Sequence, residues 1–360
     1  MQKEIFEQPQ AIRDTLESRI TNDSVLISSF GFKAEEIFNQ VKQVQIIACG
    51  SSYNAGLVAK YWLEDIAKIS CNIEVASEYR YRHPILLNGT LFVTLSQSGE
   101  TADTVEALKT AKKINSNINT LCITNSAESS LTRLSDLTFL THAGPEIGVA
   151  STKAFTTQLL ALALLTCSIG KVKKNIDNNQ EKAIVDSLKR LPGLVNEALL
   201  QEEQVQKLAI RFKDKNSALF LGRGTMHAIA MEGALKLKEI SYIHAEAYPA
   251  GELKHGPIAL IDKDMPVIAI APNDELLVKL QSNLQEVRSR GSQMIVFEDD
   301  ESKVEPMDAM EIIPITSNLG RITAPIIFTI PLQLLSYHVA LIKGTDVDKP
   351  RNLAKSVTVE

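Results

Sequence analysis

Cysteine and aromatic residues are scarce in this sequence, and their scarcity excludes several kinds of protein. Aromatic residues make up 5% of the 360 positions, and only four cysteines occur. These lie in apolar stretches without a Cys-x-x-Cys spacing: Cys49, Cys71, Cys122 and Cys167. A zinc site or a disulfide scaffold is therefore not expected, and a reducing, cytoplasmic setting fits the sequence best.

A strong charge of one sign is also missing. The formal net charge is −5 and the isoelectric point is about 5.8. Such a chain has no general positive field that would attract nucleic acid or an anionic membrane. An anionic ligand must therefore be held by local hydrogen-bond donors.

The sequence shows neither an export signal nor an uninterrupted membrane span. Acidic residues, Glu4 and Glu7, stand where a signal peptide would have its apolar run. Two apolar stretches, 154–170 and 322–343, approach the length of a membrane span, but polar residues and prolines interrupt them. We predict two buried helices and no contact with a membrane.

Glycine-rich nucleotide-binding motifs are absent as well. Gly50 and Gly222 each lie between a predicted strand and a predicted helix, but neither begins Gly-x-Gly-x-x-Gly, because His227 takes the third glycine position after Gly222. The sequence Gly-x-x-x-x-Gly-Lys-Ser does not occur either. We expect no dinucleotide, no nucleoside triphosphate hydrolysis, and no cofactor or metal.

Short apolar runs that alternate with helical patterns are what the sequence does contain, and this rhythm is typical of βαβ units in a parallel sheet. The predicted strands are 44–48, 73–76, 90–95, 119–123, 137–140, 219–222, 267–271, 293–297 and 310–315. The predicted helices are 54–69, 81–87, 102–114, 130–134 and 227–240. The fold class is therefore α/β, with parallel sheets flanked by helices.

The two halves of the chain repeat the same order of features. The strand and glycine turn at 47–51 correspond to those at 220–223, and the Glu-Tyr-Arg at 78–80 corresponds to the Glu-Leu-Lys at 252–254. We predict an internal repeat of about 150 residues, and this period is too long for a solenoid. We predict two related α/β domains joined by a polar, helix-rich connection.

The loop at residues 96–101, Ser-Gln-Ser-Gly-Glu-Thr, is predicted to hold a phosphate group. It follows a buried strand and opens a helix, so its backbone N–H groups belong to a helix N-terminus, where anions bind. Gly99 permits a tight turn, and Ser96, Ser98 and Thr101 add hydroxyl donors. The carboxyl end of a strand is also where open α/β sheets bind their ligands.

Simple helix capping is the alternative explanation for this loop, because Ser98 or Thr101 could serve only as a cap. Two further hydroxyl-bearing helix starts, at 50–52 and 150–153, favour a polar pocket instead. The corresponding loop of the second half, 271–276, has neither the hydroxyls nor the glycine. We therefore predict a single phosphate site, in the first half.

The second half carries groups suited to proton transfer. Glu232, Lys236 and Glu239 share one face of a predicted helix by i, i+4 and i+3 spacing. An exposed charged face is the simpler interpretation, but apolar residues cover much of this helix, and charges there need partners. His255 lies in a glycine-flanked loop and can exchange protons near neutral pH. Together these groups suit removal of a proton next to a carbonyl.

Several motifs in combination resemble a known family, the isomerase half of glutamine–fructose-6-phosphate aminotransferase, which is a pair of sugar-isomerase (SIS) domains. The motifs are Cys-Gly-x-Ser-Tyr, Ser-Gln-Ser-Gly-Glu-Thr-Ala-Asp-Thr, Glu-Ile-Gly-Val-Ala-Ser-Thr-Lys, Lys-Leu-Lys-Glu-Ile-Ser-Tyr, Gly-Glu-Leu-Lys-His-Gly-Pro and the C-terminal Pro-Arg-Asn-Leu-Ala-Lys-Ser-Val-Thr-Val-Glu. The resemblance covers essentially the whole chain. It implies two tandem SIS domains, each a flavodoxin-like three-layer sandwich, at 28–180 and 200–345, with an N-terminal helical segment at 1–27 and an active-site tail at 346–360.

The resemblance also implies roles for individual residues. Glu239 would move a proton between C1 and C2 of fructose 6-phosphate, Lys236 would support the charge that develops at C1, and His255 would open the sugar ring. Lys355 would reach the C2 carbonyl, with a Schiff base as one form of that contact. The residues expected to contact the phosphate and the sugar are Ser52, Ser96, Gln97, Ser98, Thr101, Val149, Ser151 and Ala354.

The family further implies partners. It implies a cytoplasmic homodimer in which the neighbouring subunit donates His255, and a glutaminase domain that supplies ammonia, so that the product is glucosamine 6-phosphate, the start of UDP-N-acetylglucosamine synthesis. The family's glutaminase nucleophile is a cysteine directly after the initiator methionine, whereas Gln2 stands here. We expect this chain not to hydrolyse glutamine, and an upstream reading frame to encode the glutaminase. Pro145 replaces a polar residue beside Glu146, which weakens a ligand role for that stretch.

Two other functions stay open. A phosphosugar sensor without catalytic activity would need the phosphate loop but not Glu239, Lys236 and His255 together, and residues 1–30 contain few basic residues for binding DNA. A deglycase that acts on a fructosamine phosphate would share the proton transfer but start from an amine adduct. The Lys-x-Lys-Glu motif and the Ala-Lys-Ser of the tail favour the synthase.

Overall fold

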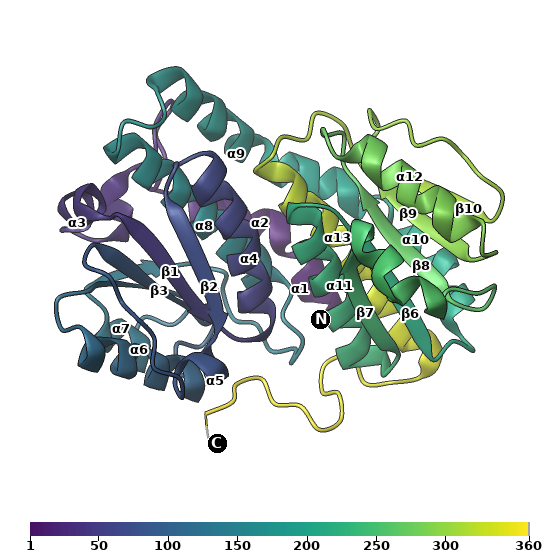
Figure 1. Cartoon of the computed structure of the whole chain (residues 1–360), viewed down its shortest axis with the longest axis horizontal. Helices are drawn as coiled ribbons and strands as arrows, with labels where there is room; N and C mark the ends of the chain where they lie inside the picture. The colour runs from purple at the N-terminus through teal and green to yellow at the C-terminus, as the bar shows by residue number, and fades with distance from the viewer. Residues whose placement is uncertain (359–360) are drawn as a thin grey trace. The chain divides into compact units, whose positions relative to one another are not determined.

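The computed structural model describes residues 1–358, and the chain forms two compact units, each with one sheet (Figure 1). The β1–β5 unit consists of Gln10–Glu146, Lys153–Arg190 and the chain from Ala354 onward. The β6–β10 unit consists of Met1–Pro9, Ile147–Thr152 and Leu191–Leu353. Each unit is therefore assembled from separate stretches of sequence.

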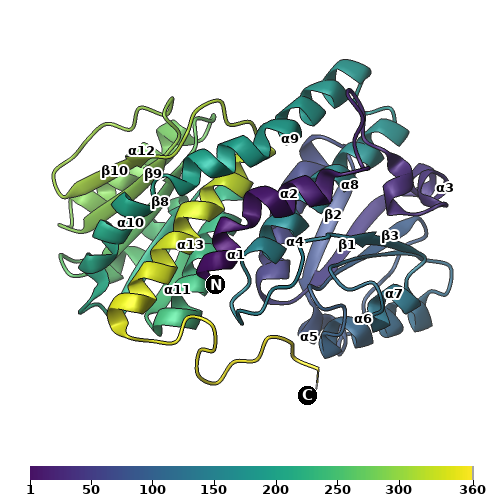
Figure 2. The same cartoon turned by 180° about the vertical axis from the view of Figure 1, so that it is seen from behind.

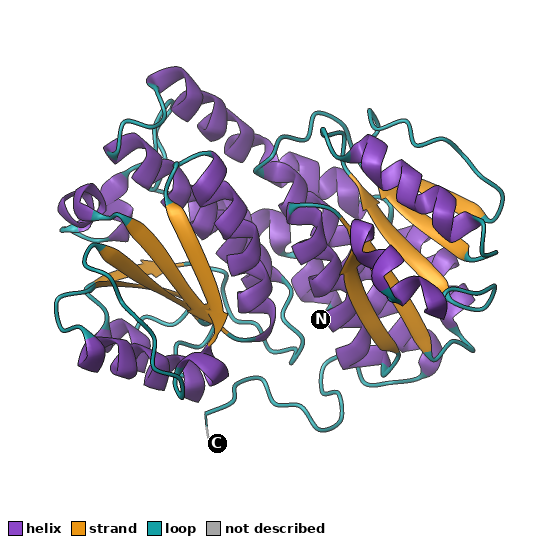
Figure 3. Cartoon of the chain, in the orientation of Figure 1, coloured by secondary structure: helices purple, strands orange, loops and turns teal. Residues whose placement is uncertain are grey.

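The sheet of the β1–β5 unit is parallel throughout, in the order β2-β1-β3-β4-β5. Its strands are β1 (Gln43–Ala48), β2 (Ser70–Val75), β3 (Thr90–Leu95), β4 (Asn119–Thr124) and β5 (Leu137–Leu140). Its helices are α3 (Ala34–Gln40), α4 (Gly50–Asp65), α5 (Ala76–Tyr79), α6 (Ala102–Ile114), α7 (Ser130–Leu134) and α8 (Lys153–Val172), with a 3-10 turn at Ile27–Phe30. Helices α4 and α8 cover one face and α5, α6 and α7 cover the other, which gives three layers (Figure 3).

The sheet of the β6–β10 unit repeats this order as β7-β6-β8-β9-β10, again parallel. Its strands are β6 (Ser217–Gly222), β7 (His244–Pro249), β8 (Pro266–Ala271), β9 (Gln293–Glu298) and β10 (Met310–Pro314). Its helices are α1 (Gln2–Phe6), α10 (Glu202–Ala209), α11 (Thr225–Ser241), α12 (Leu277–Arg288) and α13 (Thr323–Lys343), with 3-10 turns at Ile210–Phe212, Ala250–His255 and Pro257–Leu260. Helices α10, α11 and α13 pack together on one face, as the view from behind shows (Figure 2).

Two helices join the units: α2 (Gln8–Leu16) and α9 (Asn178–Leu199) each contain residues of both. The two long helices α8 and α13 are apolar enough to cross a membrane by length and composition, but 89% of each apolar window is buried inside the protein. Burial of this extent is typical of core helices, so the prediction of two buried helices is confirmed.

The predicted α/β fold with two related parallel sheets is confirmed, and so is the internal repeat. β1 begins at Gln43 and its counterpart β6 begins at Ser217, 174 residues later. The central strands β3 and β8 form because each is an apolar run whose side chains are buried on both faces, as expected for a sheet covered by helices. The boundaries predicted for the SIS domains remain a proposal.

Several elements differ from the prediction. Helices α3 and α12 were not predicted, and α4 begins and ends four residues before the predicted 54–69. The helix expected at 81–87 is wrong, because that stretch is irregular and the short helix α5 precedes it. Pro84 explains the difference, since proline has no N–H and disfavours helical geometry in the residue before it. β7 was not predicted, because as an edge strand it is only partly buried and its sequence, His-Ala-Glu-Ala-Tyr-Pro, shows no apolar run.

Candidate active site

The predicted phosphate loop lies at the carboxyl end of β3 and leads into α6, as expected. Its hydroxyl groups contact each other and the loop backbone: Ser96 Oγ lies 2.8 Å from Thr101 Oγ1 and accepts the Gly99 N–H at 3.0 Å. Ser98 Oγ accepts the Glu100 N–H at 3.2 Å. The hydroxyls therefore hold the loop in a tight turn as well as providing donors. Thr101 is the N-cap residue of α6 but makes no side-chain capping bond there, so capping alone does not explain it.

Gly99 is the residue that makes this turn sterically allowed. Its φ of +68° is in the left-handed region, and a Cβ built on it would lie 2.1 Å from Ser129 Oγ and 2.4 Å from Ser129 Cβ. Its carbonyl accepts the Leu131 N–H at 3.1 Å. The loop is thus packed tightly against the start of α7, and only glycine fits the position.

Glu100 fastens the loop to the same helix start. Its carboxylate accepts the Ser130 N–H and the Ser130 hydroxyl, both at 2.7 Å. These hydrogen bonds, the hydroxyl bond first, lower the pKa of Glu100, and Arg133 adds a weaker attraction. Glu100 therefore stabilises the loop as an anion and points to a structural role rather than to proton transfer.

The C-terminal tail contacts the phosphate loop directly. Ser356 Oγ lies 3.0 Å from Ser98 Oγ, and the carbonyl of Val357 accepts the N–H of Ala102 at 3.0 Å. Ala102 is the first residue of α6, so the tail lies at the helix N-terminus. The tail at 346–360 was predicted to belong to the active site. It lies against the phosphate loop, and its active-site role stays a prediction.

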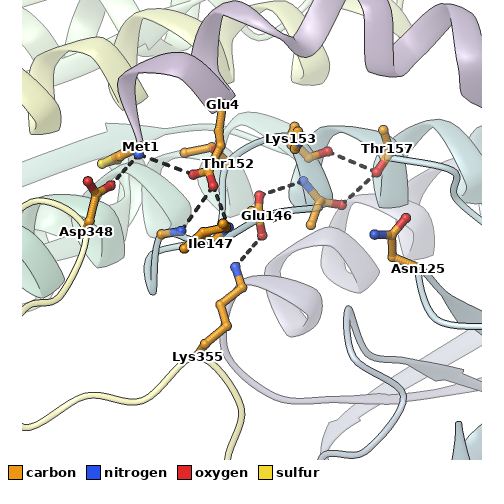
Figure 4. A network of polar contacts seen from close by, with 12 residues as sticks. Met1, Glu4, Asn125, Glu146, Ile147, Thr152, Lys153, Thr157, Asp348 and Lys355 are labelled. Carbon is orange, nitrogen blue, oxygen red and sulfur yellow. Dashed lines mark hydrogen bonds and ion pairs between the residues drawn. The ribbon is translucent and has the colours of Figure 1, made fainter. Parts of the chain in front are cut away.

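Lys355, on the same tail, pairs with a carboxylate that was not among the predicted site residues (Figure 4). Its Nζ donates to Oε2 of Glu146, whose side chain is fully buried, whereas the Lys355 side chain is 25% exposed. Oε1 of Glu146 accepts the Ala154 N–H at 3.0 Å, in the first turn of α8. Sequence alone offered Glu146 as the first residue of the Glu-Ile-Gly-Val-Ala-Ser-Thr-Lys motif and as the neighbour of Pro145. It did not point to the pair with Lys355, since 209 residues separate the two.

The segment with Val149 and Ser151 belongs to the β6–β10 unit and is held by backbone contacts. Oε1 of Glu4, on α1, accepts the N–H groups of Ile147 and Gly148 at 2.5 and 3.0 Å. The N–H of Val149 donates to the carbonyl of Asp348 at 3.0 Å. Val149 and Ser151 are both half-buried, so this segment is ordered by its own unit and still presents side chains to solvent.

The acid–base group on α11 is a buried ion-pair cluster, and the interpretation as an exposed charged face is wrong. Lys236 is 1% exposed, and its Nζ lies 2.5 Å from Oε2 of Glu239 and 3.5 Å from Oε1 of Glu232. Glu232 is also buried, whereas the side chain of Glu239 is 21% exposed. Burial of the Lys236 ammonium carries a desolvation penalty, and the two carboxylates beside it offset this penalty. One carboxylate of the cluster therefore faces solvent, as a proton-transferring group must.

His255 ends the 3-10 turn that follows β7, and it is exposed. Gly256, with φ of +137°, directly follows it and allows the chain to change direction. The predicted site residues thus fall into two groups. The β1–β5 unit holds Ser52, Ser96, Gln97, Ser98, Thr101, Ala354 and Lys355. The β6–β10 unit holds Val149, Ser151, Lys236, Glu239 and His255.

Comparison with known proteins identifies the repeated fold. The model of the SIS domain family matches residues 37–168 and 211–343, one match for each sheet. The chain belongs to the SIS domain family. Both SIS domains have the strand order 2-1-3-4-5, when the strands of each are counted along the chain.

Relatives with high sequence identity show to which family this pair of SIS domains belongs. Glutamine–fructose-6-phosphate aminotransferase [isomerizing] of Pseudomonas aeruginosa is 58% identical over 360 residues, which are 100% of this chain and 59% of that protein. The solved C-terminal domain of glucosamine-fructose-6-phosphate aminotransferase from Francisella tularensis is 52% identical, with a TM-score of 0.94 and 97% of each chain covered. The chain belongs to the family of that C-terminal domain, and it spans about three fifths of the length of the curated relatives.

A more distant structure shares the double SIS architecture. Glucosamine-6-phosphate deaminase from Thermotoga maritima is 25% identical, with a TM-score of 0.76, and 99% of this chain and 98% of that chain are covered. The fold is therefore retained when most of the sequence differs.

The second SIS domain lacks a phosphate loop in its corresponding position after β8. Asp274 stands there, and its carboxylate accepts the Leu276 N–H at 2.8 Å. Burial, the largest cause, raises the pKa of Asp274. The Asp274 carboxylate thus takes up a backbone donor of this turn and adds a negative charge, where the first SIS domain has hydroxyl groups. The single phosphate site stays a prediction.

Proposed function

We propose that the chain is the isomerase portion of glutamine–fructose-6-phosphate aminotransferase. It binds fructose 6-phosphate, converts the ketose to an aldose, and forms glucosamine 6-phosphate when ammonia is supplied. The observation that carries this proposal is the cluster on α11, where buried Lys236 pairs with the partly exposed carboxylate of Glu239. The names of the high-identity relatives support the same reaction.

The phosphate loop anchors the substrate in this proposal. Ser96, Ser98 and Thr101 provide hydroxyls at the N-terminus of α6, and the helix dipole adds a partial positive charge. Gln97 and Ser52, which are half-buried, complete the predicted phosphate contacts. Binding at the phosphate leaves C1 and C2 of the sugar for the chemical step.

Glu239 is the proposed base. Its carboxylate removes a proton from C1, which leaves an enediolate or enolamine, and the protonated carboxyl returns the proton to C2. The ammonium of Lys236, 2.5 Å from Glu239, stabilises the negative charge that develops. Glu232 balances the charge of Lys236 from its other side. A buried cluster keeps these groups in place, so little reorganisation accompanies proton transfer.

Lys355 and His255 act before the proton moves. The exposed imidazole of His255 opens the sugar ring by moving a proton between the anomeric hydroxyl and the ring oxygen. The ammonium of Lys355 then gives a proton to solvent, and the neutral amine adds to the C2 carbonyl. Loss of water gives a Schiff base, and ammonia displaces the lysine amine to give the imine of the substrate. Val149, Ser151 and Ala354 are proposed to line the sugar.

The whole protein requires partners that this chain does not contain. We infer a glutaminase domain that supplies ammonia, in line with the longer relatives. We also infer a cytoplasmic homodimer in which His255 acts on the substrate of the neighbouring subunit, which fits its exposure at the end of a turn. Neither nucleic acid nor a membrane is an expected partner.

Replacement of Glu239 tests the proposal. In D₂O with the full chain, NMR should show exchange with solvent of a C1 proton of fructose 6-phosphate and of the C2 proton of the aldose product. Glu239→Gln should slow this exchange at least about 100-fold, the lower end of a general base's contribution. Glu203→Gln is the matched control, because Glu203 also pairs with a lysine on its own helix, Lys207 at 2.7 Å, but is 80% exposed.

Each outcome separates one part of the proposal. A parent chain that binds fructose 6-phosphate without exchange would indicate a phosphosugar sensor. A chain that exchanges only a fructosamine phosphate would indicate a deglycase. Exchange at the parent rate in Glu239→Gln would reject Glu239 as the base.

A further inference from the structure

Glu146 is the buried carboxylate whose function neither the fold nor the proton transfer explains. Its side chain is fully buried, and its two oxygens have separate partners. Oε1 accepts the Ala154 N–H at the start of α8, and Oε2 binds the ammonium of Lys355. A carboxylate at the N-terminus of a 20-residue helix is stabilised by the helix dipole, so its position is well fixed.

A second set of contacts fixes the segment that carries Glu146. Asn125, which directly follows β4, donates from Nδ2 to the Gly144 carbonyl at 2.8 Å, and its Oδ1 accepts the Ala143 N–H at 2.8 Å. The Asn125 N–H donates to the Gln97 carbonyl at 3.0 Å. Asn125 therefore ties the segment before Glu146 to the phosphate loop.

These contacts form a closed ring within the β1–β5 unit. From the phosphate loop the ring runs through Asn125 to the segment ending at Glu146, across the ion pair to Lys355, and back through Ser356 to Ser98, whose hydroxyls lie 3.0 Å apart. Figure 4 shows the ion pair between Lys355 and Glu146. Both the backbone and the side-chain nitrogen of Lys355 are thereby held relative to the phosphate loop.

We propose that Glu146 is a positioning residue that holds the Lys355 ammonium at a fixed place relative to the phosphate loop. The inference deepens the proposed function and rests on it for the part that concerns turnover. Lys355 is on an exposed terminal tail, where a lysine would ordinarily sample many rotamers. A fixed carboxylate removes this freedom, and a charge-assisted pair is the strongest side-chain contact available for doing so.

Glu146→Gln tests the inference with little change in shape. The glutamine carbonyl can still accept the Ala154 N–H, but its NH₂ group cannot accept from Lys355. The matched control is Glu181→Gln, because Glu181 is also buried, binds a lysine (Lys171, 2.9 Å) and accepts a backbone N–H (Val25, 2.8 Å). Similar melting temperatures for the two variants would show that they lose comparable stability.

Turnover of fructose 6-phosphate is the first measurement. We expect Glu146→Gln to lower kcat about 10- to 100-fold, which corresponds to the free energy of one hydrogen bond to a charged group. KM should change less than about threefold, because the phosphate loop is intact. Glu181→Gln should keep parental kcat. In a Lys355→Met background, Glu146→Gln should cause no further loss, because Glu146 acts through Lys355.

Chemical labelling of Lys355 is the second measurement, and it does not depend on activity. Mass spectrometry should show faster acetylation of Lys355 in Glu146→Gln, at least about tenfold from the free energy of one hydrogen bond to a charged group, and no change in Glu181→Gln. Equal labelling in parent and Glu146→Gln, or an unchanged kcat, would overturn the inference. A parent without turnover would overturn the proposed function alone, and the labelling would still decide whether Glu146 holds Lys355.

Discussion

At the scale of single residues, the phosphate loop depends on glycine more strictly than its sequence shows. Gly99 and Gly50 both have positive φ, +68° and +54°, yet their surroundings differ. A Cβ on Gly99 would collide with Ser129, whereas nothing lies within 4 Å of a Cβ on Gly50. Substitution of these two glycines therefore measures two contributions to the free energy of unfolding separately: backbone strain alone at Gly50, and backbone strain together with a steric collision at Gly99.

Substitution of Gly99 by alanine should therefore destabilise the protein more than the same change at Gly50. We expect Gly50→Ala to lower the free energy of unfolding by about 1–2 kcal/mol, from left-handed strain alone. Gly99→Ala should add about 1–3 kcal/mol of overpacking against Ser129 and weaken phosphate binding. Urea unfolding measures the loss of stability, and titration with inorganic phosphate measures the loss of phosphate binding. Equal stability of the two variants would contradict the prediction, because it would show that the loop shifts to accommodate the added Cβ.

At the scale of elements, the sequence predicted best what is buried and continuous. Helices α6 and α7 have the predicted bounds, because each follows an apolar strand and a polar turn that are both visible locally. β7 and the irregular stretch after α5 were missed, because one is a polar edge strand and the other is set by Pro84.

The candidate site was predictable only in part for a related reason. The phosphate loop and the charges of α11 lie close together in sequence, so spacing reveals them. The contacts of the tail join residues 209 and 258 positions apart, and no local pattern encodes them. The roles of the tail residues came from resemblance to a family rather than from spacing.

Deletion of the tail from Ala354 onward should destabilise the β1–β5 unit, mainly because the ion pair between Lys355 and Glu146 is lost. We expect a loss of about 2–3 kcal/mol, somewhat below the usual cost of breaking a buried ion pair because Lys355 is partly exposed. In a Glu146→Gln background the deletion should cost only about 1–2 kcal/mol, from the hydrogen bonds of Ser356 and Val357. Urea unfolding of the parent, the tail deletion, Glu146→Gln and the combined variant tests this prediction. An equal loss of stability on deletion in both backgrounds would contradict it.

At the scale of the whole molecule, two SIS domains share a topology but not their chemistry. The first has a hydroxyl-rich loop after β3, and the second has a carboxylate in the corresponding position and an ion-pair cluster on α11. Titratable groups are buried in both. Among them, burial lowers the pKa of His227 and of His338, although the Ala247 carbonyl opposes the shift of His227 and the negative charge of Glu202 opposes that of His338.

Stability should therefore fall at acidic pH. Both histidines stay neutral in the folded state at pH values where the unfolded chain, with a pKa near 6.5, already binds protons. Their contribution is complete above pH 6.5 and is lost as the pH falls below it toward the folded pKa. Melting temperatures between pH 8 and 5.5 should show a shallower decline for the double variant His227→Gln and His338→Gln than for the parent or for the surface variant His83→Gln. A parallel decline would reject this source of acid sensitivity.

The order in which the chain contributes to its two units has a consequence for inheritance. The polypeptide passes from one unit to the other five times, and its last residues return to the unit that contains β1. No single cut, whether by a protease or at the level of the gene, can yield two fragments that each retain everything their fold uses. Loss, exchange or separate expression of one half of the gene should therefore leave the other half without part of its own unit.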